Sequence, residues 1–183
     1  MGKRIKYMLF ILISLNLYGQ DVQRAGLLKG TLTISPAFML DSKSQPFYFQ
    51  GLLEGYTSDK ISFVGEGSFY LGDLSMDPVF RYNNSIFAGF NLHPLKNGPS
   101  DLFIGIQPGI SFTKLSQQSA ADRMGVNPLA SFNIGYNYFM NEYFHFFVMG
   151  KTIFGKHSTY TVESLNEFRI SAGLGFSIPF STK

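Results

Sequence analysis

The chain has 183 residues, which suits a single domain, and it contains no cysteine. Its formal charge of +3 arises in the first segment, because Lys3, Arg4 and Lys6 precede the first acidic residue, Asp21; losing these three of 15 basic residues leaves 12 against 12 Asp and Glu. A neutral chain argues against nucleic acid as a partner, and the lack of cysteine excludes disulfides, a lipid-modified cysteine and cysteine-based metal sites.

Residues 1–20 are predicted to be a signal peptide. A cationic stretch at 1–6 precedes an apolar run at 7–15 and then small and polar residues around Gly19 and Gln20, where we expect cleavage, although Leu17 upstream is not small. The apolar run is too short to span a bilayer as a helix, which needs about 20 residues. An uncleaved N-terminal anchor is the alternative, and residues 21–183 form the predicted domain.

Alternating segments of roughly 10 to 14 residues follow, separated by clusters of Gly, Pro, Asn, Asp and Ser. In the clearest segment, Leu102, Ile104 and Ile106 alternate with Gly105 and Gln107. The predicted strands are 29–40, 46–56, 60–72, 82–93, 101–113, 127–139, 143–155 and 167–180.

These strands are expected to close into a barrel that crosses a membrane. Charged residues make up only 15% of the chain against about 25% in ordinary soluble proteins, while there are 20 Phe and 10 Tyr and no long apolar helix. Open sheet edges are not tolerated in lipid, so the strands must close, and eight strands leave an interior filled by side chains. The sequence therefore predicts an all-β, eight-stranded antiparallel up-and-down transmembrane β-barrel.

The connections alternate in length, as in bacterial barrels with short periplasmic turns and longer outer loops. Short links are expected at 57–59 and 140–142, and longer ones at 73–81, 114–126 and 156–166; the link at 41–45 is shorter than the other outer ones, and 93–100 is long for a periplasmic turn. Both ends of the mature chain then lie in the periplasm.

The segments LFIGIQPGISF (102–112), ASFNIGYNY (130–138) and FRISAGLGFSIPF (168–180) resemble the small outer-membrane β-barrels of the OmpA/OmpX type. The resemblance covers about residues 28–180. It implies a Gram-negative cell outer membrane, contact with outer-membrane lipid and a final aromatic strand similar to the signal read by the barrel-assembly machinery. The chain departs from that signal by adding three residues after Phe180.

Four charged residues lie inside the predicted strands away from their ends, and all four share the face opposite to the apolar one: Glu54, Glu66, Lys151 and Arg169. A Lys or Arg facing lipid at mid-depth would cost about 2–4 kcal/mol, so this sorting supports the assigned faces. Buried charges need partners, and we hypothesise one structural salt-bridge network in the lumen, with Gln107 among the amides that satisfy the remaining groups. A gate or narrow ion path and an acid–base site are the alternatives.

The loop residues His157, Ser158 and Glu163 were weighed as a catalytic triad, because membrane-embedded lipid A deacylases use a Ser–His–Glu arrangement on a small barrel. An ordinary solvated loop is favoured, since a triad is recognised by geometry rather than by closeness in sequence. No spacing of His, Asp or Glu resembles a metal-ligand set, so no metal and no cofactor are expected.

A secreted soluble barrel that binds a small apolar ligand is the structural rival. It would place apolar residues inside and charges outside, and the absence of Trp removes the Gly-x-Trp signature of lipocalins. We therefore predict a non-enzymatic outer-membrane barrel with a structural or surface-interaction role, four outer loops and an unidentified loop-binding partner. The alternatives are a narrow-pore channel, a membrane-embedded lipid-modifying enzyme and the soluble barrel.

Overall fold

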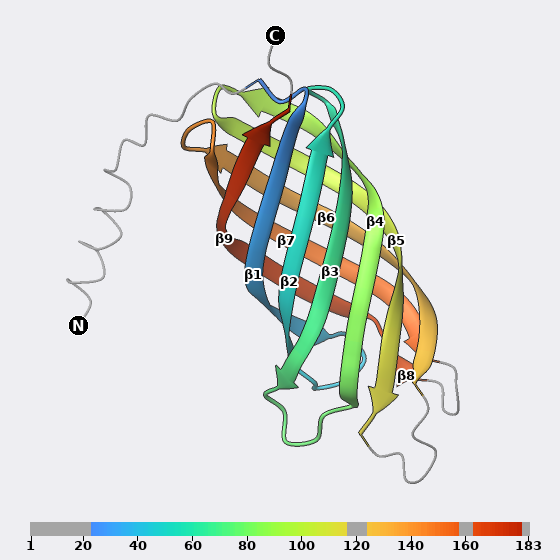
Figure 1. The fold of residues 1–183 in the computed structure, drawn as a ribbon. Helices are drawn as coiled ribbons and strands as arrows, with labels where there is room; N and C mark the ends of the chain where they lie inside the picture. Colours follow the sequence, from blue (N-terminus) through green and yellow to red (C-terminus); the bar gives the residue numbers. More distant parts are fainter. Residues whose placement is uncertain (1–22, 117–123, 158–162, 181–183) are drawn as a thin grey trace, which may run out of the picture.

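The computed structural model describes residues 23–116, 124–157 and 163–180. Within these ranges eight long strands form a closed antiparallel barrel (Figure 1), each pairing with its sequence neighbours and β9 pairing with both β7 and β1. The strands are β1 (Leu27–Met39), β2 (Pro46–Tyr56), β3 (Ile61–Asp73), β4 (Phe80–Asn97), β5 (Ser100–Leu115), β6 (Gly125–Phe139), β7 (Phe144–His157) and β9 (Glu167–Pro179). The short β8 (Glu163–Ser164) pairs with the end of β7 and lies outside the barrel wall.

The predicted eight-stranded barrel is confirmed, with two corrections to its connections. The link expected at 93–100 is a tight turn, because β4 continues to Asn97 and β5 starts at Ser100. Gly98 in this turn has a φ of +55°, a conformation that glycine adopts without steric cost. The two-residue strand β8 was not expected. Among the described residues no helix is long and apolar enough to cross a membrane.

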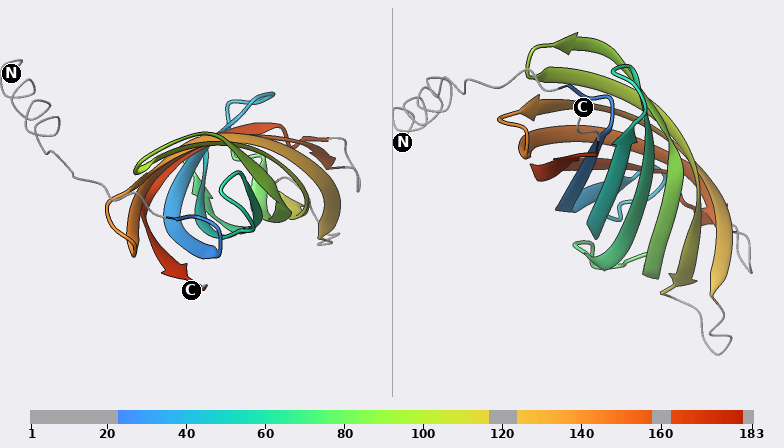
Figure 2. Two further views of the ribbon diagram at one scale, coloured as in Figure 1. Left: turned by 90° about the horizontal axis from the view of Figure 1, so that it is seen from above. Right: turned by 45° about the horizontal axis from the view of Figure 1, so that its top comes forward.

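The barrel is strongly sheared, which explains the steep tilt of its strands in Figures 1 and 2. Stepping from each residue to its partner on the next strand returns to β1 ten residues beyond the starting point. The successive partners are Leu28, Gly55, Phe63, Phe90, Ile106, Phe132, Thr152, Phe168 and Phe38.

The two ends of the barrel differ in their connections (Figure 1). The start of β1, the end of β9 and the tight turns β2–β3, β4–β5 and β6–β7 lie at one end, called here the terminal end. The connections β1–β2, β3–β4, β5–β6 and β7–β9 lie at the other, called here the loop end. An even number of barrel strands requires this separation.

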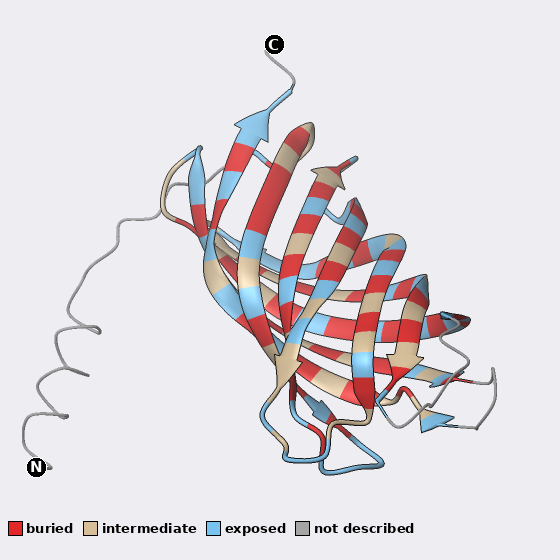
Figure 3. Cartoon of the chain, turned by 60° about the horizontal axis from the view of Figure 1, so that its bottom comes forward, coloured by how far each residue is buried: buried red, intermediate tan, exposed pale blue. Residues whose placement is uncertain are grey.

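Apolar and polar side chains lie on opposite faces of the wall, apolar outside and polar inside, as predicted for a membrane barrel. Buried and exposed residues alternate along the strands (Figure 3), most regularly in β6. Large apolar side chains point outward, with Leu32, Phe63 and Leu174 each 62% exposed. The buried set is rich in polar and charged side chains. The soluble ligand-binding barrel would have required the opposite sorting.

Glycines on the inner face make room for large side chains from neighbouring strands. A Cβ on Gly135 would collide with the ring of Phe103, and one on Gly109 would collide with the ring of Phe87. These rings therefore pack directly over the neighbouring strands, because the glycines there have no side chain.

Candidate functional site

The lumen is filled in layers that follow one another along the barrel axis. From the terminal end to the loop end, β2 contributes Glu54, Leu52, Gln50 and Tyr48 to the interior, a polar, apolar, polar order. On β7 the corresponding order is His145, then Phe147 and Met149, then Lys151 and finally Ile153.

Four groups of residues are named from this order. The terminal cluster is Arg24, Lys29, Glu54, Ser62, His93 and Asp101. The apolar layer next to it, on the side of the loop end, is Leu52, Val64, Phe103 and Met149. The loop-side cluster is Tyr48, Glu66, Gln107, Lys151, Glu167 and Arg169. The apolar cap at the loop end is Met39, Phe80, Phe87, Leu115, Leu129, Ile153 and Leu165.

Glu54 is the hydrogen-bond acceptor of the terminal cluster that lies next to the apolar layer. Its carboxylate forms an ion pair with Lys29 and accepts hydrogen bonds from Ser62 Oγ at 2.5 Å and Asn91 Nδ2 at 2.6 Å. His93 Nε2 lies 3.5 Å from the same carboxylate. Three strands, β1, β3 and β4, thus deliver groups to one buried carboxylate, as a charge without solvent requires.

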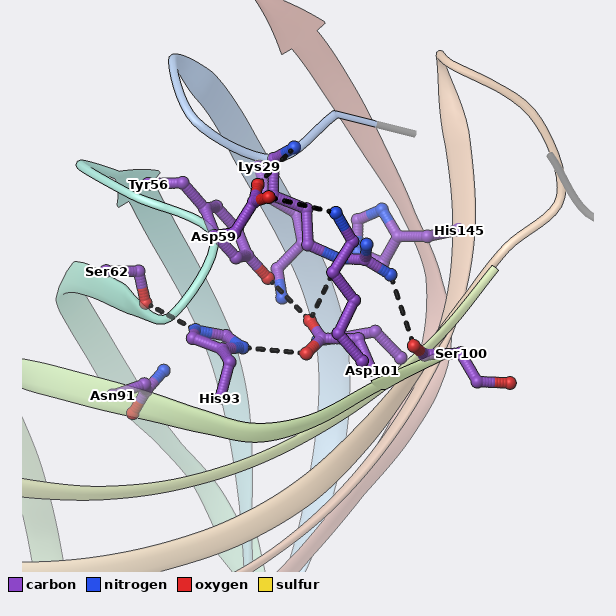
Figure 4. Close-up of polar contacts among 12 residues, drawn as sticks. Lys29, Tyr56, Asp59, Ser62, Asn91, His93, Ser100, Asp101 and His145 are labelled. Carbon is purple, nitrogen blue, oxygen red and sulfur yellow. Dashed lines mark hydrogen bonds and ion pairs between the residues drawn. The ribbon is translucent and has the colours of Figure 1, made fainter. Parts of the chain in front are cut away.

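Asp101 is the second acceptor of the terminal cluster (Figure 4). It contacts His93 Nδ1 at 2.9 Å and accepts a hydrogen bond from Tyr56 OH at 2.9 Å. Asn137 Nδ2 donates to it at 3.3 Å, and the Nε of Arg24 lies 3.7 Å away. The imidazole of His93 is therefore shared between two carboxylates.

Ser62, His93 and Asp101 have the connectivity of a catalytic triad, with Ser62 Oγ 2.9 Å from His93 Nε2 (Figure 4). The hydroxyl of Ser62, however, donates to Glu54, so its oxygen is left to accept from His93. Both imidazole nitrogens then donate, which describes a charged imidazolium rather than a general base. Ser62 is fully buried, and so a substrate has no access to it. The arrangement is suited to holding charge.

Arg24 closes the terminal end of the lumen from the segment that precedes β1. Its Nη2 donates to the carbonyls of Gly98 and Ser100, each at 3.2 Å, and its guanidinium lies 4.8 Å from the centre of the Phe139 ring. Its side chain is fully buried. The backbone amides of Arg24 and Ala25 donate to Asp59 in the β2–β3 turn, which fixes this segment across the mouth of the barrel.

The loop-side cluster contains two ion pairs. Lys151 Nζ donates to Glu66 at 2.8 Å and to Gln107 at 2.6 Å, and it lies 3.7 Å from the centre of the Phe87 ring. Arg169 is paired with Glu167, through Nε at 2.9 Å and Nη2 at 2.5 Å. Each cation is therefore held by a carboxylate and by further polar or aromatic contacts, as buried charges require.

Arg169 and its carboxylate partner are tied to the rest of the wall. The guanidinium lies 3.8 Å from the centre of the Tyr48 ring, and the hydroxyl of Tyr48 donates to Glu167 at 2.9 Å. Asn83 in turn donates to the Tyr48 hydroxyl at 2.9 Å. These contacts join β2, β4 and β9 across the lumen.

Comparison with protein-family models and with curated proteins finds no match for this sequence. Three solved structures share its architecture. Neisserial surface protein A is 13% identical, with a TM-score of 0.65 over 84% of this chain and 96% of that one. The N-terminal β-barrel domain of Pseudomonas aeruginosa OprF is 13% identical, with a TM-score of 0.54 over 87% of this chain and 99% of that one. Ail, the attachment invasion locus protein of Yersinia pestis, is 12% identical, with a TM-score of 0.52 over 84% and 99%.

The fold is that of the small eight-stranded outer-membrane barrels. The resemblance found in the strand pattern therefore holds at the level of fold. At 12–13% identity the likeness carries no residue roles, and the lumen must be interpreted from its own contacts.

The structure places all five predicted lumen residues inside the barrel but divides them between two clusters. Glu66, Lys151 and Gln107 contact one another. Glu54 belongs to the terminal cluster, beyond the apolar layer, and Arg169 is paired with Glu167. The single network hypothesised from the sequence is thus corrected to two, because large apolar side chains on β2, β3, β5 and β7 separate them.

Several charged members of the clusters were not identified from the sequence. Lys29, Asp101 and Glu167 lie at strand ends, where inward parity alone does not distinguish a buried charge from a solvated one. Arg24 precedes the first strand, and His93 is the last residue of its predicted strand, 82–93. Extending the period-two alternation of β4 past His93 to Asn97 would have placed that imidazole inside.

The residues weighed as a loop triad do not form one where the structure describes them. His157 is buried and its Nδ1 lies 2.8 Å from the hydroxyl of Thr113, which also accepts a hydrogen bond from Asn127. Glu163 is the backbone partner of His157 in the β7–β8 pairing, and Ser158 lies outside the described residues. No group of three or more His, Asp or Glu that could hold a metal ion occurs in the described part of the chain.

Proposed function

We propose that the protein is an integral outer-membrane barrel that serves as a rigid scaffold and presents its loop end at the cell surface, with a structural or surface-interaction role. The filled, layered lumen carries this proposal. Side chains of the two charge clusters, the apolar layer and the apolar cap occupy the space that would have to hold water in a pore. The interior therefore stabilises the wall and does not conduct.

The outer surface supports insertion in a bilayer. The exposed apolar side chains encircle the wall, and burying apolar area is worth about 25 cal/mol per Å². The described strands direct their mid-strand charges inward, which avoids the cost of a charge facing lipid. Export through a signal peptide at residues 1–20, delivery by the barrel-assembly machinery and contact with outer-membrane lipid are part of the same proposal.

Two connections at the loop end support the presentation of a defined surface. Asp73 accepts hydrogen bonds from the Ser44 hydroxyl, from the Gln45 amide at 3.0 Å and from the Ser75 amide at 2.7 Å. The β1–β2 and β3–β4 connections are thereby joined. Beyond this contact Leu74 is 70% exposed and Met76 fully exposed, and such apolar side chains are suited to contact a partner.

The names of two structural neighbours agree with a surface role, since one is Neisserial surface protein A and another is the attachment invasion locus protein of Yersinia pestis. For this chain we propose a loop-binding partner without assigning its identity.

Fractionation and heat-modifiable gel migration test the location. We expect the protein in the outer-membrane fraction, with a compact band that shifts on boiling. Recovery in the soluble periplasmic fraction would overturn the membrane proposal.

Conductance in planar bilayers tests the filled lumen. We expect no discrete channel steps from the wild-type protein. The double variant Phe103→Ala with Met149→Ala, which removes much of the apolar layer, provides the comparison. Conductance steps of stable size from the wild-type protein would contradict the scaffold proposal and support a narrow pore.

Mass analysis of lipid A from cells with and without the protein tests the enzymatic alternative. We expect the same lipid A profile with the protein, without it, and with its Ser62→Ala variant. A change that depends on Ser62 would show that the buried Ser–His–Asp arrangement is catalytic.

A further inference from the structure

We infer that a single water molecule binds in the lumen beside Asn137 and joins the terminal cluster to the loop-side half of the barrel. The starting point is a cavity of about 10 Å³ in the wall of the apolar layer. This volume is about the smallest that accommodates one water. Its lining includes Lys29, Gln50, Leu52, Glu54, Phe103 and Asn137.

The side-chain oxygen of Asn137 is a hydrogen-bond acceptor that lacks a donor. The residue is 1% exposed, and its Nδ2 donates to Asp101. That contact fixes the orientation of the amide, because a carboxylate only accepts. Its Oδ1 is therefore directed away from Asp101, and among the described residues this atom has no hydrogen-bond partner. A buried carbonyl oxygen in such a position costs about 1–3 kcal/mol if it is left unsatisfied.

Further polar groups on the cavity complete the coordination of a water. Gln50 accepts from Ser171 through Oε1 at 2.6 Å, so its amide nitrogen is the atom that can donate elsewhere. Glu54 offers a carboxylate and Lys29 an ammonium in the same lining. A water that donates to Asn137 and Glu54 and accepts from Gln50 or Lys29 makes the usual three hydrogen bonds of a buried water.

The same lining identifies the ligand as water rather than an ion. Lys29 and Glu54 neutralise each other in a direct ion pair, so the cavity carries no net charge to hold a cation or an anion. Its volume also leaves no room for a hydrated ion. Leu52, Phe103 and Met149 also line the cavity and supply apolar contacts.

The position of this water gives it a structural consequence. Glu54 and Lys29 belong to the terminal cluster, whereas Gln50 lies beyond Leu52, toward the loop end. Gln50 accepts a hydrogen bond from Ser171, whose hydroxyl oxygen lies 2.9 Å from that of Ser35. One water therefore bridges the apolar layer by hydrogen bonds while the layer stays closed to ions.

A high-resolution crystal structure of the detergent-solubilised barrel tests the site directly, and NMR in micelles tests it in solution. We expect an ordered water within about 3.2 Å of Asn137 Oδ1 and a cross-peak between the Asn137 side-chain amide and a long-lived water. An empty cavity, or an Oδ1 that accepts from Lys29 or Gln50 directly, would overturn the assignment.

A double-mutant cycle tests the bridge. Asn137→Leu and Gln50→Leu each remove one partner of the water, and we expect their combined effect on the unfolding equilibrium constant to be roughly two- to five-fold smaller than the product of the single effects. The control pairs Asn137→Leu with Gln107→Leu, since Gln107 does not line the cavity. Additive behaviour in both cycles, with all variants folded, would contradict the bridge.

Discussion

The two charge clusters of the lumen neutralise their buried charges in different ways. In the loop-side cluster each cation has one carboxylate partner and an aromatic ring, as Lys151 has Glu66 and Phe87. In the terminal cluster the acceptors are shared, since Glu54 and Asp101 both contact His93 and each has a further cation.

This difference determines how each cluster responds to substitution. A pair can be removed as a unit without leaving a charge behind. A shared network cannot, because every carboxylate neutralises more than one cation, and removing any pair leaves a third group unmatched. The terminal cluster is therefore the more constrained part of the lumen.

The largest expected effect follows from removing Glu54. Glu54→Leu leaves Lys29 without its carboxylate and leaves His93 with Asp101 alone, and we expect a loss of about 3–5 kcal/mol in the free energy of unfolding. Adding Lys29→Met should not restore the loss, because His93 and Arg24 then share the single carboxylate of Asp101. The measurement is urea unfolding in lipid vesicles followed by circular dichroism, as the chain has no tryptophan. Full recovery in the double variant would mean that Glu54 acts in a simple pair.

The loop-side cluster should behave in the opposite way. Lys151→Met leaves Glu66 without its cation, and we expect a cost of about 3 kcal/mol. Combining it with Glu66→Leu should recover most of that cost, since an apolar pair of similar size then replaces the ion pair. The same unfolding assay compares the two single variants with the double variant. A double variant as unstable as the singles would place this pair in a wider network.

The contrast also shows what could be predicted from the sequence. Alternation along the strands predicted the barrel, its two faces and the inward position of Glu66 and Lys151, because a charge in mid-strand must avoid lipid. It did not predict which charges meet, since contacts across the lumen depend on shear and tilt, and these arise from the closure of all eight strands.

The terminal cluster was harder to predict for a physical reason. Charges at strand ends are ordinarily solvated, so Lys29 and Asp101 carried no signal of burial. Arg24 enters the lumen only because the segment before β1 folds back across the mouth and is held by Asp59. Such a segment has no periodicity from which its position could be derived.

The apolar layer that separates the clusters should be sensitive to added volume. A Cβ on Gly135 would collide with the Phe103 ring and lie 2.8 Å from the backbone oxygen of Val148, so we expect Gly135→Ala to cost about 1–3 kcal/mol. Gly65→Ala is the matched control, because a Cβ there meets no atom within 4 Å, and its effect should stay within about 0.5 kcal/mol. Equal effects in the unfolding assay would show that Phe103 moves aside and that the layer is loosely packed.

The smallest expected effect concerns Asp59, which holds the segment of Arg24 over the terminal cluster. Partial burial by itself raises the pKa of Asp59, but hydrogen bonds from Lys96 Nζ and from the amides of Ala25 and Arg24 outweigh it and lower the pKa below 3.8. A carboxyl group whose pKa is lower in the folded state stabilises the fold above its unfolded pKa, and this contribution is lost as the pH falls below about 4. Asp59→Asn should therefore reduce the loss of thermal stability between pH 7 and pH 3, measured by heat-modifiable migration, whereas Asp77→Asn at an exposed loop position should leave it unchanged. If Asp59→Asn loses as much stability on acidification as the wild type, the contact between Asp59 and the Arg24 segment does not contribute to closing the terminal end.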